Sequence, residues 1–247
     1  MKRPFAINYR RGPDPTAIRV EARFAKPVPP DQRDALLLPL AGWAKLGERG
    51  GLAGDRIPPP QSGVSLQSHG AAGAAVLSWV FTGALINDRA FYVLENILHY
   101  MHSTIAPLHG VVIQTGLVSD GYIAPEAFPP LFKQTPFALL LDVTGRGMNL
   151  SVEVPEPGPA AQVAEQLMLT WVGDWFYAAS MGAYGDSRVE PAQTRFLFSQ
   201  EPTWGPAGLE FFLDEASGNE SAFDALVNVL HKAHREVTPI VSVALES

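Results

Sequence analysis

Two pairs of histidines are the side chains in this sequence whose type and spacing most readily suggest chemistry. His99 and His102 stand three positions apart in NILHYMHSTIAP, and His231 and His234 repeat the spacing in NVLHKAHREVTP. Histidines one helical turn apart can share a metal ion, and a neutral imidazole can act as a general base. Each pair also lies in the last turns of a predicted helix, where histidine interacts favourably with the exposed carbonyl groups.

A metal site would need a third ligand beside each pair. His109 is available after the first pair, but Val241 takes its position after the second. A match of spacing alone is a frequent false positive. We therefore expect a structural role for these five histidines and predict no metal ion and no cofactor. Catalysis or ligand binding through them remains the alternative.

The helical pattern around the histidines predicts which side of each helix is buried. Leu94 and Leu98 recur at helical spacing and belong to the side that faces the core. His102 lies at the flank of that side, and Asn96 lies away from it. We therefore expect Asn96 and its counterpart Asn228 to face solvent.

The two histidine helices belong to a longer internal repeat. Shifting the sequence by 132 residues aligns 18–115 with 150–247 without a gap, and 23 of the 98 aligned positions are identical. Unrelated segments of ordinary composition match at about one position in fifteen. The identical pairs include Val20 and Val152, Glu21 and Glu153, and Trp43 and Trp175. The sequence therefore predicts a tandem duplication.

Each copy reads as strand, helix, two strands, helix and strand. In the first copy the strand is AIRVEARF (17–24), the helix spans 30–47, and the paired strands are GVSLQS and AAVLSWVF. The histidine helix ends before Pro107, and GVVIQT forms the last strand. This order predicts an α+β fold of two ferredoxin-like βαββαβ units, each with two helices on one face of a four-stranded antiparallel sheet. We expect the two sheets to pack on each other or to join edge to edge.

The repeat divides the chain into three parts. Residues 1–116 form the first ferredoxin-like unit with an N-terminal extension, 117–149 form a proline-rich connector, and 150–247 form the second, acidic unit. Within the connector, FALLLDV (137–143) is expected to add a strand. A connector of this length that contains Phe and Leu is expected to lie against the surface.

The two units differ strongly in charge. Residues 18–115 contain 8 basic and 7 acidic residues, whereas 150–247 contain 4 basic and 14 acidic residues, in a chain of formal net charge −7. Acidic residues run through the second hairpin into the following helix, at Glu201, Glu210, Asp214, Glu215 and Glu220. They serve either solubility or the docking of a basic protein, because complementary charge speeds association.

These features favour a non-catalytic protein that binds a partner. The sequence has no cysteine and none of the common nucleophile-elbow, zinc-protease, P-loop or dinucleotide-binding motifs. An acidic protein of this kind is similar, at the level of class only, to inhibitors such as the bacterial immunity proteins that neutralise basic, nuclease-like toxins. We therefore predict a basic protein partner that binds the acidic residues of the second unit.

The alternative is a small-molecule enzyme or ligand-binding protein. Paired ferredoxin-like units can enclose a cavity between their sheets, as in dimeric α+β-barrel proteins that work without a cofactor or with haem. The histidines of the first unit would then supply the polar groups, namely His69, His99, His102 and His109. A scaffold or assembly subunit is a third hypothesis.

Nucleic acid and membrane are not expected as partners. The third strands lack the aromatic pattern of RNA-recognition domains, and the net charge is negative. The most apolar stretch, 167–183, is short for a membrane span and contains Asp174 in its middle. The N-terminus carries no continuous apolar run typical of a signal peptide, so we expect a soluble cytoplasmic protein.

Overall fold

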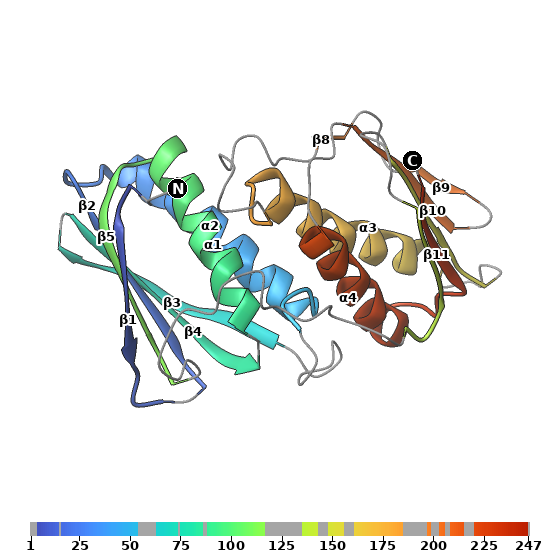
Figure 1. The fold of residues 1–247 in the computed structure, drawn as a ribbon, viewed down its shortest axis with the longest axis horizontal. Coiled ribbons are helices and arrows are strands. Elements are labelled where there is room, and N and C mark those ends of the chain that lie inside the picture. The colour runs from blue at the N-terminus through green and yellow to red at the C-terminus, as the bar shows by residue number, and fades with distance from the viewer. Residues whose placement is uncertain are drawn as a thin grey trace.

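The computed structural model describes most of the chain as a mixed α+β protein with two sheets and four helices (Figure 1). The described residues are 4–14, 16–53, 63–73, 75–85, 88–116, 135–142, 148–155, 161–184, 197–198, 203–205, 208–214 and 220–246. Among the described helices, none has the length and apolar character that crossing a membrane requires.

The first half of the chain forms a five-stranded sheet with two helices on one face (Figure 1). Its elements are β1 (Ala6–Arg11), β2 (Ile18–Phe24), α1 (Pro30–Glu48), β3 (Gly63–Gly73), β4 (Val76–Leu85), α2 (Asp88–Thr104) and β5 (Leu108–Thr115). The strand order is β1-β5-β2-β4-β3. β1 runs parallel to β5, and the other neighbours are antiparallel.

The second half repeats this plan. Its elements are β6 (Ala138–Asp142), β7 (Met148–Glu153), α3 (Ala161–Ser180), β8 (Leu197–Phe198), β9 (Thr203–Gly205), β10 (Gly208–Asp214), α4 (Glu220–Glu236) and β11 (Ser242–Glu246). The strand order is β6-β11-β7-β10-β8, and β9 also pairs with β10. The strand expected within 137–143 is present as β6, and it runs parallel to β11 as β1 does to β5. The second sheet therefore includes residues that the sequence assigned to the connector.

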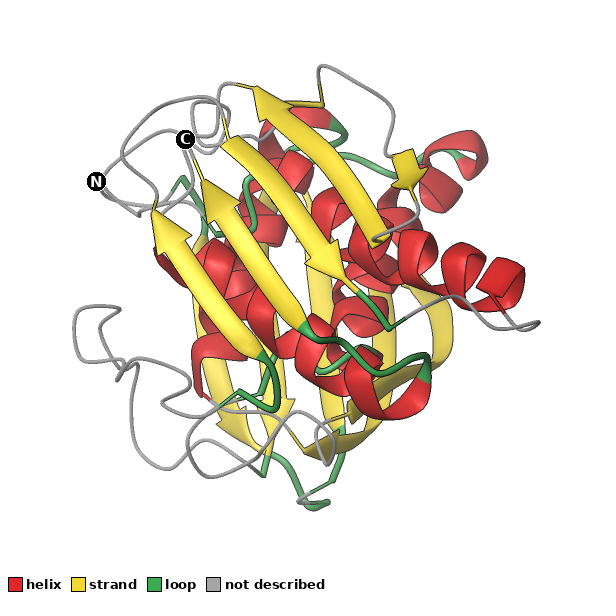
Figure 2. Cartoon of the chain, turned by 90° about the vertical axis from the view of Figure 1, so that its right-hand side faces the viewer, coloured by secondary structure: helices red, strands yellow, loops and turns green. Residues whose placement is uncertain are grey.

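The helices lie between the two sheets, which form the two ends of the molecule in Figure 1. Figure 2 shows the second sheet in front and helices directly behind it. Both predicted arrangements, one sheet packed on the other and the two sheets joined edge to edge, are therefore wrong. Within the described part of the chain, no cavity lies between two facing sheets.

The reason for this layering lies in helices that are apolar on more than one side. In α3, Val172 and Trp175 are buried on the side that repeats the core-facing side of α1, and Trp171 and Ala178 are buried on another side. A helix of this kind needs a second surface to cover it. In this protein that surface is the helical layer of the other half, because α1 contacts α3.

The contact between the halves has an approximate two-fold character. Arg49 at the end of α1 donates from Nε to Asp174 Oδ2 of α3 at 3.2 Å, and its guanidinium lies 4.6 Å from the Trp171 ring centroid. A Cβ atom on Gly42 would lie 3.4 Å from Met181 Cε. At the offset of 132 residues, Gly42 is the counterpart of Asp174 and Arg49 is the counterpart of Met181. The approach of Gly42 to Met181 is therefore the equivalent of the contact between Asp174 and Arg49.

Equivalent tryptophans fix the two helices of each half to one another. Trp43 on α1 donates its indole N–H to the carbonyl of Ala90 on α2 at 3.0 Å, and Trp175 on α3 donates to Ala222 on α4 at 2.8 Å. Both indoles are fully buried, and a buried indole N–H needs such an acceptor. The interior of both halves is therefore built on the same contact.

The first strand of the repeat departs from the ungapped alignment. Val20 on β2 pairs with Ile113 on β5. The residue 132 positions after Ile113 is Leu245, which pairs with Leu150 and not with Val152. The ungapped alignment is therefore wrong for this strand, whose true offset is 130. A slip of two residues keeps the same side of the strand facing inward, since side chains alternate with a period of two.

Candidate functional site

The second histidine of each pair has a structural task. His102 Nδ1 accepts the backbone N–H of Leu108 at 2.9 Å, and His234 Nδ1 accepts that of Ile240 at 3.0 Å. An accepting Nδ1 carries no proton, so these bonds select the neutral ring with its proton on Nε2. Each histidine thereby holds the turn that leads from its helix into the last strand.

Equivalent phenylalanines pack beside these two imidazoles. The Phe5 ring centroid lies 5.2 Å from that of His102, and the Phe137 centroid lies 6.2 Å from that of His234. Phe5 precedes β1 and Phe137 precedes β6, so the contact attaches each parallel edge strand to a helix. The repeat therefore extends to Phe5, and the matching Phe-Ala at 5–6 and 137–138 was the sequence signal for it.

The other histidines do not converge on a common point. His99 is half-buried, with its ring centroid 6.5 Å from that of His102, and His109 is exposed on β5. Burial, and to a smaller extent the charge of Arg235, lower the pKa of His231 and favour its neutral form. Within the described residues, no three His, Asp or Glu side chains are grouped to hold a metal ion.

Asn96 and Asn228 are buried, contrary to the prediction that they face solvent. Asn96 Nδ2 donates to the carbonyl of Ala183 in the other half at 3.0 Å. Asn228 is 0% exposed, and neither polar atom of its amide has a hydrogen-bond partner within the described residues. The prediction failed because the side of each helix that is outermost in one unit is covered by the other unit.

Two further buried polar groups escaped the sequence analysis. Tyr9 on β1 donates its hydroxyl to Glu95 Oε1 on α2 at 2.6 Å. The residues 132 positions later are Leu141 and Val227, so the second half has no such pair. The Tyr184 hydroxyl is buried without a partner in the described part of the chain, and burial raises the pKa of Tyr184 well above its usual value.

The outer face of the second sheet, turned away from the helices, is acidic. Every charged residue in its described strands is acidic, namely Asp142, Glu153, Glu210, Asp214 and Glu246. Strand alternation places Glu246 outward, because Val243 and Leu245 are buried inward, and Glu246 pairs with Asp142. Glu153 accepts a 2.6 Å hydrogen bond from the Ser242 hydroxyl.

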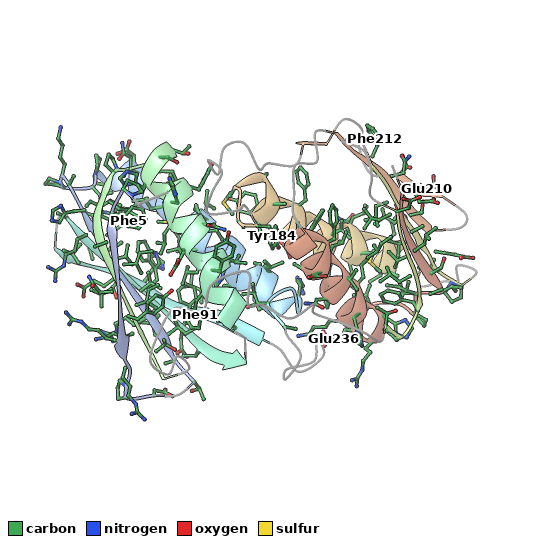
Figure 3. The ribbon with its side chains drawn as sticks, viewed as in Figure 1. Phe5, Phe91, Tyr184, Glu210, Phe212 and Glu236 are labelled. Atoms are coloured by element: carbon green, nitrogen blue, oxygen red, sulfur yellow. The ribbon has the colours of Figure 1, made fainter. Side chains whose placement is uncertain are left out.

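Two outward residues on β10 complete this surface. Glu210 is exposed, and Phe212 is half-buried two positions further along (Figure 3). We call Asp142, Glu153, Glu210 and Glu246 the acidic face. Its members come from four strands that are far apart in sequence, so only the strand order brings them together.

The predicted partner-binding residues are placed only in part. Glu210 belongs to the acidic face, Asp214 ends β10, and Glu220 begins α4. Glu201 and Glu215 lie outside the described residues, and only the backbone of Asp214 and Glu220 is described. Sequence reasoning missed the other three members of the acidic face.

The outer face of the first sheet carries the opposite charge. Its described strands contain four arginines and one glutamate, and we call the outward Arg10, Arg19 and Arg23 the arginine face. Arg23 Nη2 lies 3.4 Å from Glu21 Oε1. The sheet registers make Asp142 the counterpart of Arg10 and Glu153 the counterpart of Arg23, which is a reversal of charge at equivalent positions.

Comparison with known proteins gives no family. No protein-family model and no curated protein matches the chain. The chain is similar to a solved structure of aspartokinase alpha and beta subunits, with 11% identity, 90% of this chain and 95% of that chain covered, and a TM-score of 0.26. It is also similar to the ferredoxin protease FusC in complex with Arabidopsis ferredoxin, with 10% identity, 94% and 34% covered, and a TM-score of 0.23. Both TM-scores are too low to define a shared fold or function.

Proposed function

We propose that this protein is a non-catalytic binding protein that docks a basic protein on its acidic face. The observation that carries the proposal is the charge of the second sheet, whose described strands hold five carboxylates and no basic residue. The equivalent strands of the first sheet hold four arginines, so the fold itself does not require acidic residues there. Charge of one sign on one face speeds encounter with a partner of opposite sign.

Apolar residues beside the carboxylates support docking rather than solubility alone. Leu140 on β6 is 51% exposed and shares the outer side of its strand with Asp142. Phe212 on β10 is half-buried on the same face. Leu139 and Leu141 are also exposed along the sheet edge. An apolar patch within a polar rim is typical of protein interfaces.

Inhibition of a basic enzyme, such as the nuclease-like toxin bound by an immunity protein, is one form that this binding could take. The charge pattern alone does not single it out. The cytoplasmic location expected from the sequence stays a prediction. The competing hypothesis of an enzyme with a cavity between its sheets loses support, because helices occupy that space.

We also propose that each half is a ferredoxin-like βαββαβ unit preceded by one parallel edge strand, and that the halves arose by tandem duplication. The order β5-β2-β4-β3 in one half and β11-β7-β10-β8 in the other supports this interpretation. The repeated tryptophan and histidine contacts support it as well.

The test begins with capture of partners from the native host at low salt, followed by mass spectrometry and reconstitution with the purified partner. Affinity is then measured by calorimetry at several salt concentrations. We expect a basic protein whose binding weakens about a hundredfold when the acidic face is neutralised. The variant combines Asp142→Asn, Glu153→Gln, Glu210→Gln and Glu246→Gln. The matched control neutralises the arginine face with Arg10→Gln, Arg19→Gln and Arg23→Gln, and it leaves the affinity unchanged.

Two outcomes would contradict the proposal. In the first, the reconstituted partner binds the neutralised variant as tightly as the original protein. In the second, the partner is another copy of this chain, with the arginine face of one molecule on the acidic face of the next. Sedimentation would then reveal salt-sensitive self-association that both variants abolish.

A further inference from the structure

A pocket in the first half lies apart from the acidic face. It has a volume of about 320 Å³ and opens between the first turns of α1 and the β3–β4 hairpin. Arg33 and Asp34 line it from α1, and His69, Leu77 and Trp79 line it from the hairpin. Its size falls within the range of small-ligand sites.

Arg33 supplies the first sign of what the pocket binds. Its Nε atom is buried and has no hydrogen-bond partner within the described residues. No ion pair of Arg33 occurs there either. A guanidinium presents parallel N–H donors that match the two oxygens of a carboxylate or phosphate. A buried donor without an acceptor among the described residues suggests an acceptor that arrives from outside.

Other groups around the pocket also favour an anion. The N-terminus of α1 begins at Pro30, which lines the pocket, and a helix N-terminus carries partial positive charge. His69 stands on the hairpin side of the same pocket. Arg19 does not line this pocket, because it faces outward and lines a separate hollow of about 280 Å³ on the outer side of the sheet. Asp34 is the one opposing charge among the lining residues.

The apolar side chains that line the pocket suggest that the ligand carries an apolar group beside its anionic group. Trp79 is 2% exposed and Leu77 is 5% exposed, so the little surface that each retains faces this pocket. A ligand held by Arg33 at one end would bury its apolar part against these two side chains.

The second half offers a natural comparison for this site. The residues 132 positions after Arg33 and His69 are Glu165 and Glu201. Glu165 lies within α3, so an arginine is not needed at this position to build the helix, whereas Glu201 lies outside the described residues. Basic residue types at these two positions occur in the first half only, as expected for a site that evolved there for binding.

We infer that the pocket binds a small organic oxyanion, either a carboxylate or a phosphate ester, with an apolar body. The Arg33 guanidinium and His69 receive the anionic group, and Trp79 and Leu77 receive the body. This site is independent of the proposed docking of a basic protein, because it lies in the other half and uses cations.

The inference is tested with ¹H–¹⁵N NMR titrations of the full chain at constant ionic strength. The probes are inorganic phosphate, benzoate and phenyl phosphate, with chloride as the reference salt. We expect saturable shifts of the Trp79 indole and the amides of 69–71, with phenyl phosphate or benzoate binding more tightly than inorganic phosphate. The stronger of these two identifies whether a phosphate or a carboxylate is the natural group. Absence of saturation with all three probes overturns the inference.

Three variants show whether Arg33 is the receptor for the anion. Arg33→Gln weakens binding at least about tenfold, since it removes the charge and the paired donors. Arg33→Lys keeps the charge but loses the paired N–H donors of the guanidinium. Its affinity should lie between that of the original protein and that of Arg33→Gln. Asp34→Asn strengthens binding about two- to fivefold, because it removes a repulsive charge. A gain of affinity cannot result from misfolding.

The matched control is Glu165→Gln, which makes the same kind of change at the equivalent position of the second half and leaves the affinity unchanged. An affinity that is the same in Arg33→Gln as in the original protein contradicts the inference. Shifts confined to the arginine face contradict it as well. The variant whose acidic face is neutralised should still bind the probes in the pocket. Failure of one proposal therefore does not imply failure of the other.

Discussion

The two halves of this protein share their interior contacts and differ in their outer faces. Trp43 and Trp175 make the same bond to a helix carbonyl, and His102 and His234 make the same bond to a strand amide. At two outward positions, arginine in the first sheet (Arg10 and Arg23) is replaced by a carboxylate in the second (Asp142 and Glu153). The repeated contacts therefore indicate what the fold requires, and the inverted charges mark where the two halves diverged.

The interior also has exceptions to this rule. Tyr9 and the buried Glu95 form a partly buried polar pair in the first half that Leu141 and Val227 replace in the second. Asn96 is hydrogen-bonded across the interface between the halves, but Asn228 has no partner within the described residues. Equivalent positions in the two halves therefore serve as controls for one another.

The largest expected effect comes from removing the shared tryptophans. Trp43→Ala and Trp175→Ala should each lower the free energy of unfolding by about 3–5 kcal/mol, because each leaves a large cavity and removes the hydrogen bond of the indole N–H. Urea denaturation of the two variants measures this. A clearly milder effect of one variant would mean that the halves do not depend on the contact equally.

The next effect is expected at the repeated histidines. His102→Ala and His234→Ala should each cost about 1–3 kcal/mol, because the buried amide of Leu108 or Ile240 loses its acceptor. Denaturant unfolding measures the loss. His109→Ala, at an exposed position on β5, is the control and should change stability by less than about 0.5 kcal/mol. Equal losses in all three variants would refute the structural role.

Equivalent asparagines should respond with opposite signs. Asn228→Leu should stabilise the protein by about 1 kcal/mol, since it replaces an amide that is buried without partners by an apolar group of similar size. Asn96→Leu should destabilise it by about 1 kcal/mol or more, because the carbonyl of Ala183 loses its donor. Thermal unfolding of both variants compares the two. Destabilisation by both would show that Asn228 contributes a bond to the native state.

The smallest expected effect is a dependence of stability on pH. The folded protein lowers the pKa of His231, mainly through burial, so the unfolded chain binds a proton more readily. Stability should therefore fall as the pH drops below about 6.5, the ordinary value for histidine, and this loss should be weaker in His231→Gln. Unfolding curves collected across this pH range test the prediction. An unchanged pH profile in the variant would assign the dependence to another group.

The sequence predicted the elements but not how the halves meet. Periodicity and the 132-residue repeat were enough for the order of strands and helices within each predicted unit, and for β6, but they missed the parallel edge strand β1. They could not predict the layering, because a helix such as α3 with apolar residues on two sides does not identify what covers each side. The burial of Asn96 failed for the same reason.

The acidic face illustrates a second limit of sequence reasoning. Glu210 was predicted as part of a binding surface, but Asp142, Glu153 and Glu246 were not. These residues are separated by long stretches of sequence and become neighbours only when the strand order is known. The two-residue slip of β7 also hid the reversal from Arg23 to Glu153, since an ungapped alignment pairs Glu153 with Glu21.

The placement of the helices between the sheets keeps the two oppositely charged surfaces apart. The acidic face and the arginine face point in opposite directions and are separated by both helical layers (Figure 1). A protein docked on the acidic face, as we propose, would therefore leave the arginine face accessible. Substitutions on one face are accordingly expected to leave the other face unchanged.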